Sequence, residues 1–205
     1  MTDPERLAAL LGLEPLPHEG GRFRRTYADA HSSAILYLLV APEFSALHRL
    51  TAAEAYHWHA GSPLRLLLLH PGDPPSVRSG GPTPDGVHAR CTGSVPSVHS
   101  DRPGPDAVHT RGEGVAGGRV DVAAGGRVEE VVLGPDVERG ERPQAVVPAG
   151  AWQGSAPDGG PGAWTLVSTT VAPPFDWAMF ALGDAAALAA AYPAAAARIG
   201  ELTRR

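Results

Sequence analysis

Short apolar segments separated by turn residues run along most of the chain. Ser32–Val40 is an apolar run of strand length, and Leu64–Leu69 is a second one. Between these two runs, Phe44–Leu50 and Glu54–Ala60 predict two further strands, because turn-forming residues separate all four segments. The first third of the chain therefore predicts an antiparallel β-structure.

The later part of the chain continues the same pattern. Arg127–Leu133 and Ala163–Val171 contain several β-branched residues and predict strands. Gln144–Val147 leads into a tight turn at Pro148–Gly150, and a further extended or bridging segment is expected after Pro173-Pro174. Strands that alternate with turns, without a βαβ pattern, indicate an antiparallel sandwich or barrel.

Helices are predicted only at the two ends of the chain. Near the start, Thr2 or Asp3 can cap a short helix that Gly12 ends. Near the end, Asp184 caps a helix and Pro193 begins a second one. The expected fold class is therefore mainly β, with short N- and C-terminal helices.

The segment from residue 73 to residue 126 has a different composition. It contains no Phe, Trp, Tyr, Leu, Ile or Met and is rich in Gly, Pro and Ser. Such a segment cannot bury enough apolar area to offset the entropy of ordering it. We expect residues 73–126 to form a flexible Gly/Pro-rich insertion between two strands of a single domain over residues 1–205. His88, His99 and His109 in this segment lack the close spacing of a metal site.

Composition and charge exclude several classes of function. The formal net charge is −5 and no basic block is present, so nucleic acid and an anionic membrane surface are not expected partners. No apolar run reaches the roughly 20 residues of a membrane span, and we expect a soluble, cytoplasmic protein. All 17 basic residues are arginine, which excludes a Schiff-base lysine, a lysine-anchored pyridoxal phosphate and a lysine-containing phosphate loop. The single cysteine, Cys91, excludes an intrachain disulfide.

A histidine and a glutamate lie on two neighbouring predicted strands. His48 belongs to the strand Phe44–Leu50, and Glu54 begins the strand that follows it. Antiparallel neighbours bring two such side chains together if both point into the interior. The turn Pro148–Gly150 could deliver Gln153 to the same place, so we predict a pocket around these three polar side chains.

Strand alternation decides which nearby residues share this pocket. If Glu54 faces inward, Tyr56 and Trp58 do so as well, and His57 and His59 face the opposite side of the sheet. We therefore expect these two histidines on the outer face, where they could contribute to a dimer interface. The reverse arrangement, with both histidines inward, would remove Glu54 from the pocket.

These residues resemble the two motifs of the cupin superfamily. The first motif carries a His-x-His pair, a Glu four or five residues later and a Gly after six more, and this chain matches it at His48, Glu54 and Gly61. The second motif reads Pro-x-Gly-x-x-His, which corresponds here to Pro148 through Gln153. The chain is most similar to the cupin family DUF985, over the segments HEGGRFRRTY, SALHRL, EAYHWHAGSPL, VVLGPDVERGERPQAVVPAGAWQG and VAPPFDWAMFALGD.

The resemblance implies a fold and a class of reaction. The fold is an RmlC-like jelly-roll, an antiparallel β-barrel with a small-molecule pocket. Members of the family are often described as predicted sugar epimerases, which suggests an isomerase or epimerase acting on a sugar-like polar metabolite. His48 would then be the general base, Glu54 would orient it or tune its charge, and Tyr37 or Tyr27 would return the proton.

The chain departs from the metal-binding cupin pattern, which supplies two histidines, a glutamate and a third histidine. Ala46 occupies the first histidine position and Gln153 occupies the third. One alternative is a divalent metal (Fe, Mn, Ni or Zn) held by His48, Glu54 and Gln153, and the other is a metal-free polar pocket. A metal-dependent oxygenase or isomerase and a non-catalytic small-ligand binder are therefore alternative functions.

Aromatic and basic side chains complete the predicted ligand site. Arg24 or Arg22 could bind a carboxylate or a phosphate with its planar guanidinium. Aromatic rings are expected to wall the pocket, although core packing is the alternative for each of them. These candidate wall residues are Trp58, Tyr56, Phe44 and Trp152. The expected partners are a small-molecule ligand and a second copy of the chain in a homodimer.

Overall fold

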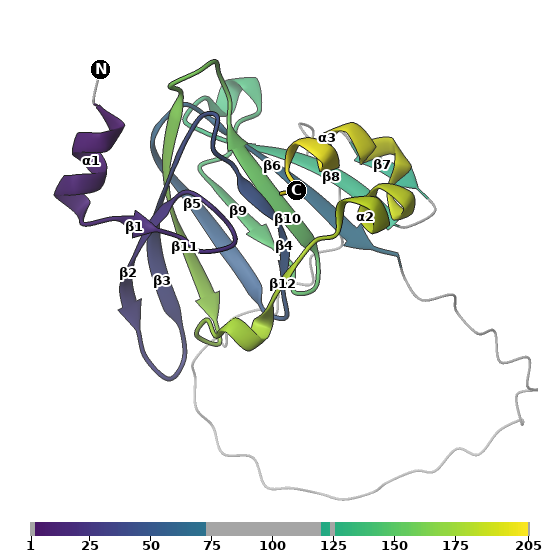
Figure 1. Cartoon of the computed structure of the whole chain (residues 1–205), viewed down its shortest axis with the longest axis horizontal. Coiled ribbons are helices and arrows are strands. Elements are labelled where there is room, and N and C mark those ends of the chain that lie inside the picture. The colour runs from purple at the N-terminus through teal and green to yellow at the C-terminus, as the bar shows by residue number, and fades with distance from the viewer. Residues whose placement is uncertain (1–2, 73–119, 124–125, 205) are drawn as a thin grey trace, which may run out of the picture. The chain divides into compact units, whose positions relative to one another are not determined.

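Two antiparallel sheets make up most of the described chain. The structure is a computed structural model that describes residues 3–72, 120–123 and 126–204. Within these residues each sheet has six strands (Figure 1). The first sheet contains, in spatial order, β1 (Glu14–Pro15), β2 (Arg22–Ala28), β3 (Ser33–Val40), β11 (Trp164–Ala172), β5 (Ala53–Gly61) and β9 (Gln144–Val147). The second sheet contains β12 (Phe180–Leu182), β4 (Ser45–Leu50), β10 (Trp152–Pro157), β6 (Leu64–Pro71), β8 (Gly126–Leu133) and β7 (Val120–Ala123).

The mainly β fold with short terminal helices is confirmed, with one correction. The sequence predicts a barrel, but the two sheets are not closed into one. Strands β1 and β9 of the first sheet, and β12 and β7 of the second, each pair with a neighbour on one side only in the described chain. The architecture is therefore a sandwich of two open sheets.

The space between the sheets is filled by alternate side chains from both of them. Tyr37, Tyr56 and Val167 of the first sheet belong to one buried cluster with Leu66 and Leu68 of the second. All five are at most 2% exposed. Burial of such side chains is the main favourable contribution to folding, at roughly 1.5–3 kcal/mol for each large apolar side chain.

Helix α1 (Pro4–Leu11) covers part of the outer face of the first sheet. The carboxylate of Asp3 accepts a hydrogen bond from a backbone N–H of the first turn, and Gly12 ends the helix in a left-handed conformation. Both ends agree with the sequence prediction. The helix packs against Leu38 and Leu166 of the sheet.

The C-terminal helices cover the outer face of the second sheet. Helices α2 (Ala185–Ala191) and α3 (Ala196–Glu201) pack against Leu67 and Leu69 of β6. Strand β6 is thus buried on both faces, which is why its sequence is almost continuously apolar. The remaining helical segments are the short η1 (Val137–Arg139), η2 (Trp177–Met179) and η3 (Pro193–Ala195).

The sequence places most of the strands within a few residues but does not predict β1, β7 or β10. Strand β10 follows the turn at Pro148–Gly150, where the sequence indicates only the turn. Strand β7 lies inside the interval 73–126 that is expected to be a loop, and residues 73–119 of that interval are outside the described residues. None of the helices in the described chain is long and apolar enough to cross a membrane.

Candidate functional site

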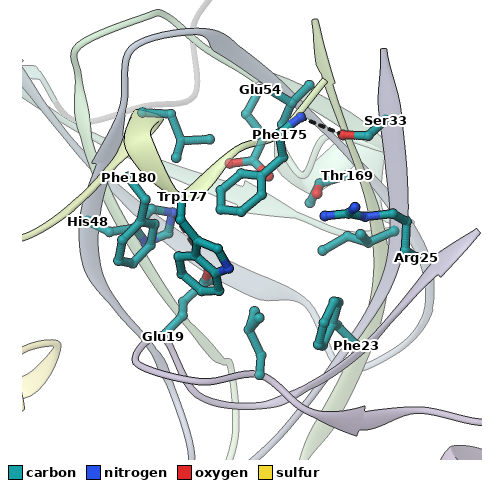
Figure 2. Close-up of a pocket in the computed structure, with 14 residues that line it drawn as sticks. Glu19, Phe23, Arg25, Ser33, His48, Glu54, Thr169, Phe175, Trp177 and Phe180 are labelled. Carbon is teal, nitrogen blue, oxygen red and sulfur yellow. Dashed lines mark hydrogen bonds and ion pairs between the residues drawn. The ribbon is translucent and has the colours of Figure 1, made fainter. Parts of the chain in front are cut away.

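A pocket lies between the two sheets, where His48 and Glu54 both contribute to its wall (Figure 2). The cavity volume is about 100 Å³. A single water needs roughly 10–15 Å³ by this measure, so the enclosed part has room for a small metabolite. The polar side chains that line the pocket are Glu19, Arg25, Ser33, His48, Glu54 and Thr169. The aromatic ones are Phe23, Phe175, Trp177 and Phe180.

His48 of β4 is held by the backbone in one ring orientation. Its Nδ1 lies 2.8 Å from the carbonyl oxygen of Ala46, and its side chain is 2% exposed. Because a carbonyl oxygen can only accept a hydrogen bond, Nδ1 carries the proton, and in the neutral ring Nε2 presents a lone pair. The ring also stacks on Phe180, with 5.1 Å between the ring centroids.

Glu54 of β5 reaches the same pocket from the opposite sheet. The expectation that the strands of His48 and Glu54 are antiparallel neighbours is therefore wrong, because β4 and β5 belong to different sheets. Its carboxylate accepts a hydrogen bond of 2.6 Å from Nε2 of Gln153, which lies on β10 beside His48 in the strand register. Burial raises the pKa of Glu54, and the negative charge of Glu19 raises it further. The positive form of His48 and the hydrogen bonds from Thr169 and Gln153 act in the opposite direction. The net shift is upward, so Glu54 holds a proton more readily than an exposed glutamate.

A second carboxylate, Glu19, stands beside His48. Its Oε2 is 4.0 Å from Nε2 of His48, and its Oε1 accepts a hydrogen bond of 2.6 Å from the hydroxyl of Ser45. The loop that carries Glu19 depends on Gly21, whose φ is +70°. A Cβ atom at this position would come within 2.8 Å of Tyr37 and Leu39. Only glycine therefore fits the loop where it passes β3.

The segment that follows β11, residues 173–179, closes another side of the pocket. We call this segment the aromatic arm. The backbone N–H of Phe175 donates to the hydroxyl of Ser33 at 2.9 Å, which ties the arm to β3. Trp177 packs edge-on against both Phe175 and Phe180, with ring centroids 5.2 and 5.4 Å apart. The side chain of Trp177 is 50% exposed, so it lies at the boundary between the pocket and solvent.

Several residues predicted for the site lie in the protein core instead. The hydroxyl of Tyr37 donates to the carbonyl of Gly20 at 2.8 Å, and Tyr56 is buried in the cluster between the sheets. Trp58 packs against the same cluster and donates through Nε1 to the carbonyl of Ser62. Core packing, the alternative that the sequence left open for the aromatic residues, is the observed role of these side chains.

Other predicted residues lie on the outer surfaces. Phe44 and Trp152 pack with the C-terminal helices on the outer face of the second sheet. Tyr27 is 53% exposed and donates to Asp29, and Arg24 donates to the carbonyl of Leu11. None of these four side chains lines the pocket.

Strand alternation predicts the facing of β5 correctly. Glu54 and Tyr56 are buried, whereas His59 is exposed and hydrogen-bonds to Ser168 on the outer face of the first sheet. His57 is partly exposed and pairs with Ser168 in the strand register. The described structure contains one chain, and the homodimer expected at this face stays a prediction.

Sequence reasoning misses Glu19, Arg25, Thr169 and the aromatic arm. Glu19 and Arg25 belong to the segment HEGGRFRRTY, and the arm belongs to VAPPFDWAMFALGD. Both segments carry the family resemblance, so their polar and aromatic residues were available as a signal. The side-chain directions of Glu19 and of the aromatic residues in the arm could not be predicted, because a turn or a proline pair interrupts the periodicity there.

The side chains in the pocket do not fit the metal site that the sequence offers as an alternative. In the described part of the chain, no three His, Cys, Asp or Glu side chains are grouped closely enough to hold a metal ion. Gln153 turns its nitrogen, which cannot bind a cation, toward Glu54. The amide oxygen of Gln153 is buried without a hydrogen-bond partner among the described residues. We therefore derive no step that passes through a metal.

Comparisons with known proteins agree with this architecture. A family model described as the cupin superfamily (DUF985) matches residues 5–183. The crystal structure of a protein from Shewanella oneidensis is 26% identical, with a TM-score of 0.67 and coverage of 100% of this chain and 99% of that chain. A hypothetical protein from Leishmania major is 27% identical, with a TM-score of 0.67 and full coverage of both chains. A search of curated proteins finds no match.

The raised pKa of Glu54 predicts a pH dependence of stability. Between the ordinary value of 4.5 and the raised value in the folded state, the folded protein binds more protons than the unfolded chain. The free energy of unfolding therefore falls as the pH rises through this window. In Glu54→Gln this contribution is absent, so its stability should fall less than that of the wild type over the same window. Urea unfolding at a series of pH values measures the difference.

A matched control separates this effect from the removal of any carboxylate. Glu138 is exposed on η1, so Glu138→Gln should follow the wild-type curve. If the free energy of unfolding changes with pH in parallel for the wild type and Glu54→Gln across this window, the upward shift of the Glu54 pKa is contradicted.

Proposed function

This chain belongs to the DUF985 family of the cupin superfamily, and from that premise we propose that its pocket binds a small polar metabolite and catalyses proton transfer next to a carbonyl group. An isomerase or an epimerase performs this chemistry. The observation that carries the proposal is the pairing of an imidazole lone pair with a carboxyl group of raised pKa in one enclosed, aromatic-walled pocket. Base and acid of this kind are what abstraction and return of a proton require.

His48 is the proposed general base. The hydrogen bond from Nδ1 to the carbonyl of Ala46 leaves Nε2 free to accept a proton from the substrate. The imidazolium that forms would be stabilised by the carboxylate of Glu19, whose Oε2 is 4.0 Å from Nε2.

Glu54 is the proposed general acid. A carboxyl group whose pKa is raised by burial keeps its proton to a higher pH than an exposed one and can donate it to a developing oxyanion. The hydrogen bond from Gln153 fixes the orientation of the carboxyl group. Tyr37 is a weaker candidate for this role, because burial raises its pKa well above 10.0 and its hydroxyl is bonded to the carbonyl of Gly20.

The proposed reaction balances with these two groups and, for inversion, one solvent water. His48 removes the proton from the carbon next to the carbonyl, and Glu54 gives its proton to the carbonyl oxygen, which yields an enol. For inversion, a water molecule gives a proton to the opposite face of the same carbon, the enol oxygen returns its proton to Glu54, and the hydroxide takes the proton from His48. For isomerisation, the deprotonated carbon bears a hydroxyl group: His48 gives its proton to the former carbonyl carbon, the hydroxyl group gives its proton to Glu54, and the carbonyl group moves by one carbon. Both outcomes leave the enzyme unchanged.

Exchange of substrate hydrogen with solvent tests the proposal. In deuterated water, the protein should exchange the hydrogen next to the carbonyl of at least one member of a panel of sugar phosphates, keto acids and nucleotide-linked keto sugars. The variant His48→Asn keeps a donor for the carbonyl of Ala46 but lacks Nε2, and Glu54→Gln lacks the acidic proton. Each should lower the exchange rate by about 10²–10⁴-fold, as loss of a general base or acid does. Proton NMR measures the rate directly.

His59→Asn is the control, since His59 lies on the outer face and should leave the rate unchanged. If no member of the panel exchanges, although thermal shift shows that some of them bind, the protein is a non-catalytic binder and the proposal is wrong. Equal rates for His48→Asn and the wild type would contradict the role of His48.

The pocket is proposed to work without a metal ion. The donor atoms argue for this, since the Gln153 nitrogen lies 2.6 Å from the carboxylate that a cation would use. Protein purified without a histidine tag should contain Fe, Mn, Ni and Zn at well below one equivalent by elemental analysis. Exchange should also survive treatment with a chelator. Near-equimolar metal that is lost in Glu54→Gln would overturn this point and restore the metal-dependent alternative.

A further inference from the structure

The arginines of strand β2 divide between the two faces of the strand. Arg22 donates two hydrogen bonds to Glu5, of 2.6 and 2.9 Å, and Arg24 donates to the carbonyl of Leu11 at 2.9 Å. All three bonds lead to residues of α1, on the outer side of the sheet. Phe23 and Arg25 have the opposite facing, because side chains alternate along a strand, and both line the pocket. Of these three arginines, Arg25 is therefore the one at the pocket.

The Arg25 guanidinium is available to a ligand. Among the residues that the structure describes, it has no hydrogen bond and no ion pair, whereas Arg22 and Arg24 each have a partner. Figure 2 shows its side chain pointing into the pocket from the wall opposite His48. Its strand neighbour Ile35 also lines the pocket and offers no competing acceptor.

Positive and negative groups lie on different sides of the pocket. Glu19 and Glu54 stand with His48, and neither of them pairs with Arg25. An anionic group of a ligand would be repelled near the Glu19 carboxylate and attracted to the guanidinium. A ligand with an anionic group at one end therefore has one favourable orientation in the pocket, with that group at Arg25.

We propose that Arg25 binds the anionic group of the substrate and that the substrate is a small carboxylate or phosphate ester. The planar guanidinium binds both anions through two parallel hydrogen bonds. With the anion at Arg25, the remainder of the molecule lies between the aromatic rings and extends toward His48 and Glu54. This inference rests on the proposed function, because it names the substrate class for the same pocket, and it assigns Arg25 rather than Arg24 to the anion.

Equilibrium binding of three matched probes tests the inference. Glycerol, glycerate and glycerol 3-phosphate share a three-carbon skeleton and differ in charge and in the anionic group. Their dissociation constants can be measured by ligand-observed NMR for the wild type, Arg25→Gln and Arg24→Gln. Arg24→Gln is the matched control, since it makes the same chemical change on the opposite face of the same strand.

At least one of the two anions should bind the wild type more tightly than glycerol does. Arg25→Gln should weaken that binding by about tenfold or more, which is about 1.4 kcal/mol, whereas Arg24→Gln should change it by less than about twofold. The stronger of the two anions identifies the substrate as a carboxylate or as a phosphate ester. Equal effects of the two substitutions would overturn the inference. So would glycerol binding as tightly as the anions, or the absence of anion binding up to roughly 10 mM.

The two proposals fail in different ways. His48→Asn should lower the exchange rate by about 10²–10⁴-fold but keep the preference for the anionic probes over glycerol, since it keeps Arg25. If the wild type exchanges hydrogen but does not bind the anions more tightly than glycerol, the assignment of Arg25 is wrong and the proton-transfer function still holds. If anion binding depends on Arg25 but no exchange occurs, the catalytic proposal is wrong and the proposed class of ligand still holds.

Discussion

One hydrogen bond joins the two sheets beside the pocket, and the candidate site depends on it. Gln153 of the second sheet donates to Glu54 of the first over 2.6 Å. A buried carboxylate without such a donor would be strongly destabilised. Because Gln153 pairs with His48 in the strand register, the same bond holds Glu54 near the imidazole. The glutamine that departs from the metal-binding cupin motif thus has a structural role of its own.

The rest of the pocket is built around this polar pair by irregular segments. The glycines before β2 let the loop approach β3 closely enough for Glu19 to reach Ser45 and His48. The arm after β11 brings Phe175 and Trp177 over the opposite side. Aromatic walls reduce the exposure of the polar groups to water, which strengthens every electrostatic interaction inside. Fixed sheets therefore supply the proposed acid and base, and the irregular segments enclose them.

The sequence predicts the part of this site that follows strand periodicity. Alternation along β5 gives the inward Glu54 and the outward His59, and the family resemblance identifies His48 and Gln153. Periodicity could not locate Glu19 or the aromatic arm, because loops have no fixed facing. It also could not distinguish a wall of the pocket from the core for Trp58 and Tyr56, since aromatic side chains on the inner face of a sheet are typical of both. The openness of the sandwich depends on the pairing of edge strands, which a single sequence does not reveal.

The most direct test of the account is the protonation pattern of His48 measured by ¹⁵N NMR of its imidazole ring. The account predicts that in the neutral ring Nδ1 carries the proton and Nε2 does not, and that Glu54→Gln shifts the Nε2 resonance while Glu138→Gln does not. A neutral ring protonated at Nε2 would contradict the hydrogen bond from Nδ1 to Ala46 and the role of Nε2 as the base. A resonance indifferent to Glu54→Gln would show that the imidazole and the carboxyl group do not share one pocket.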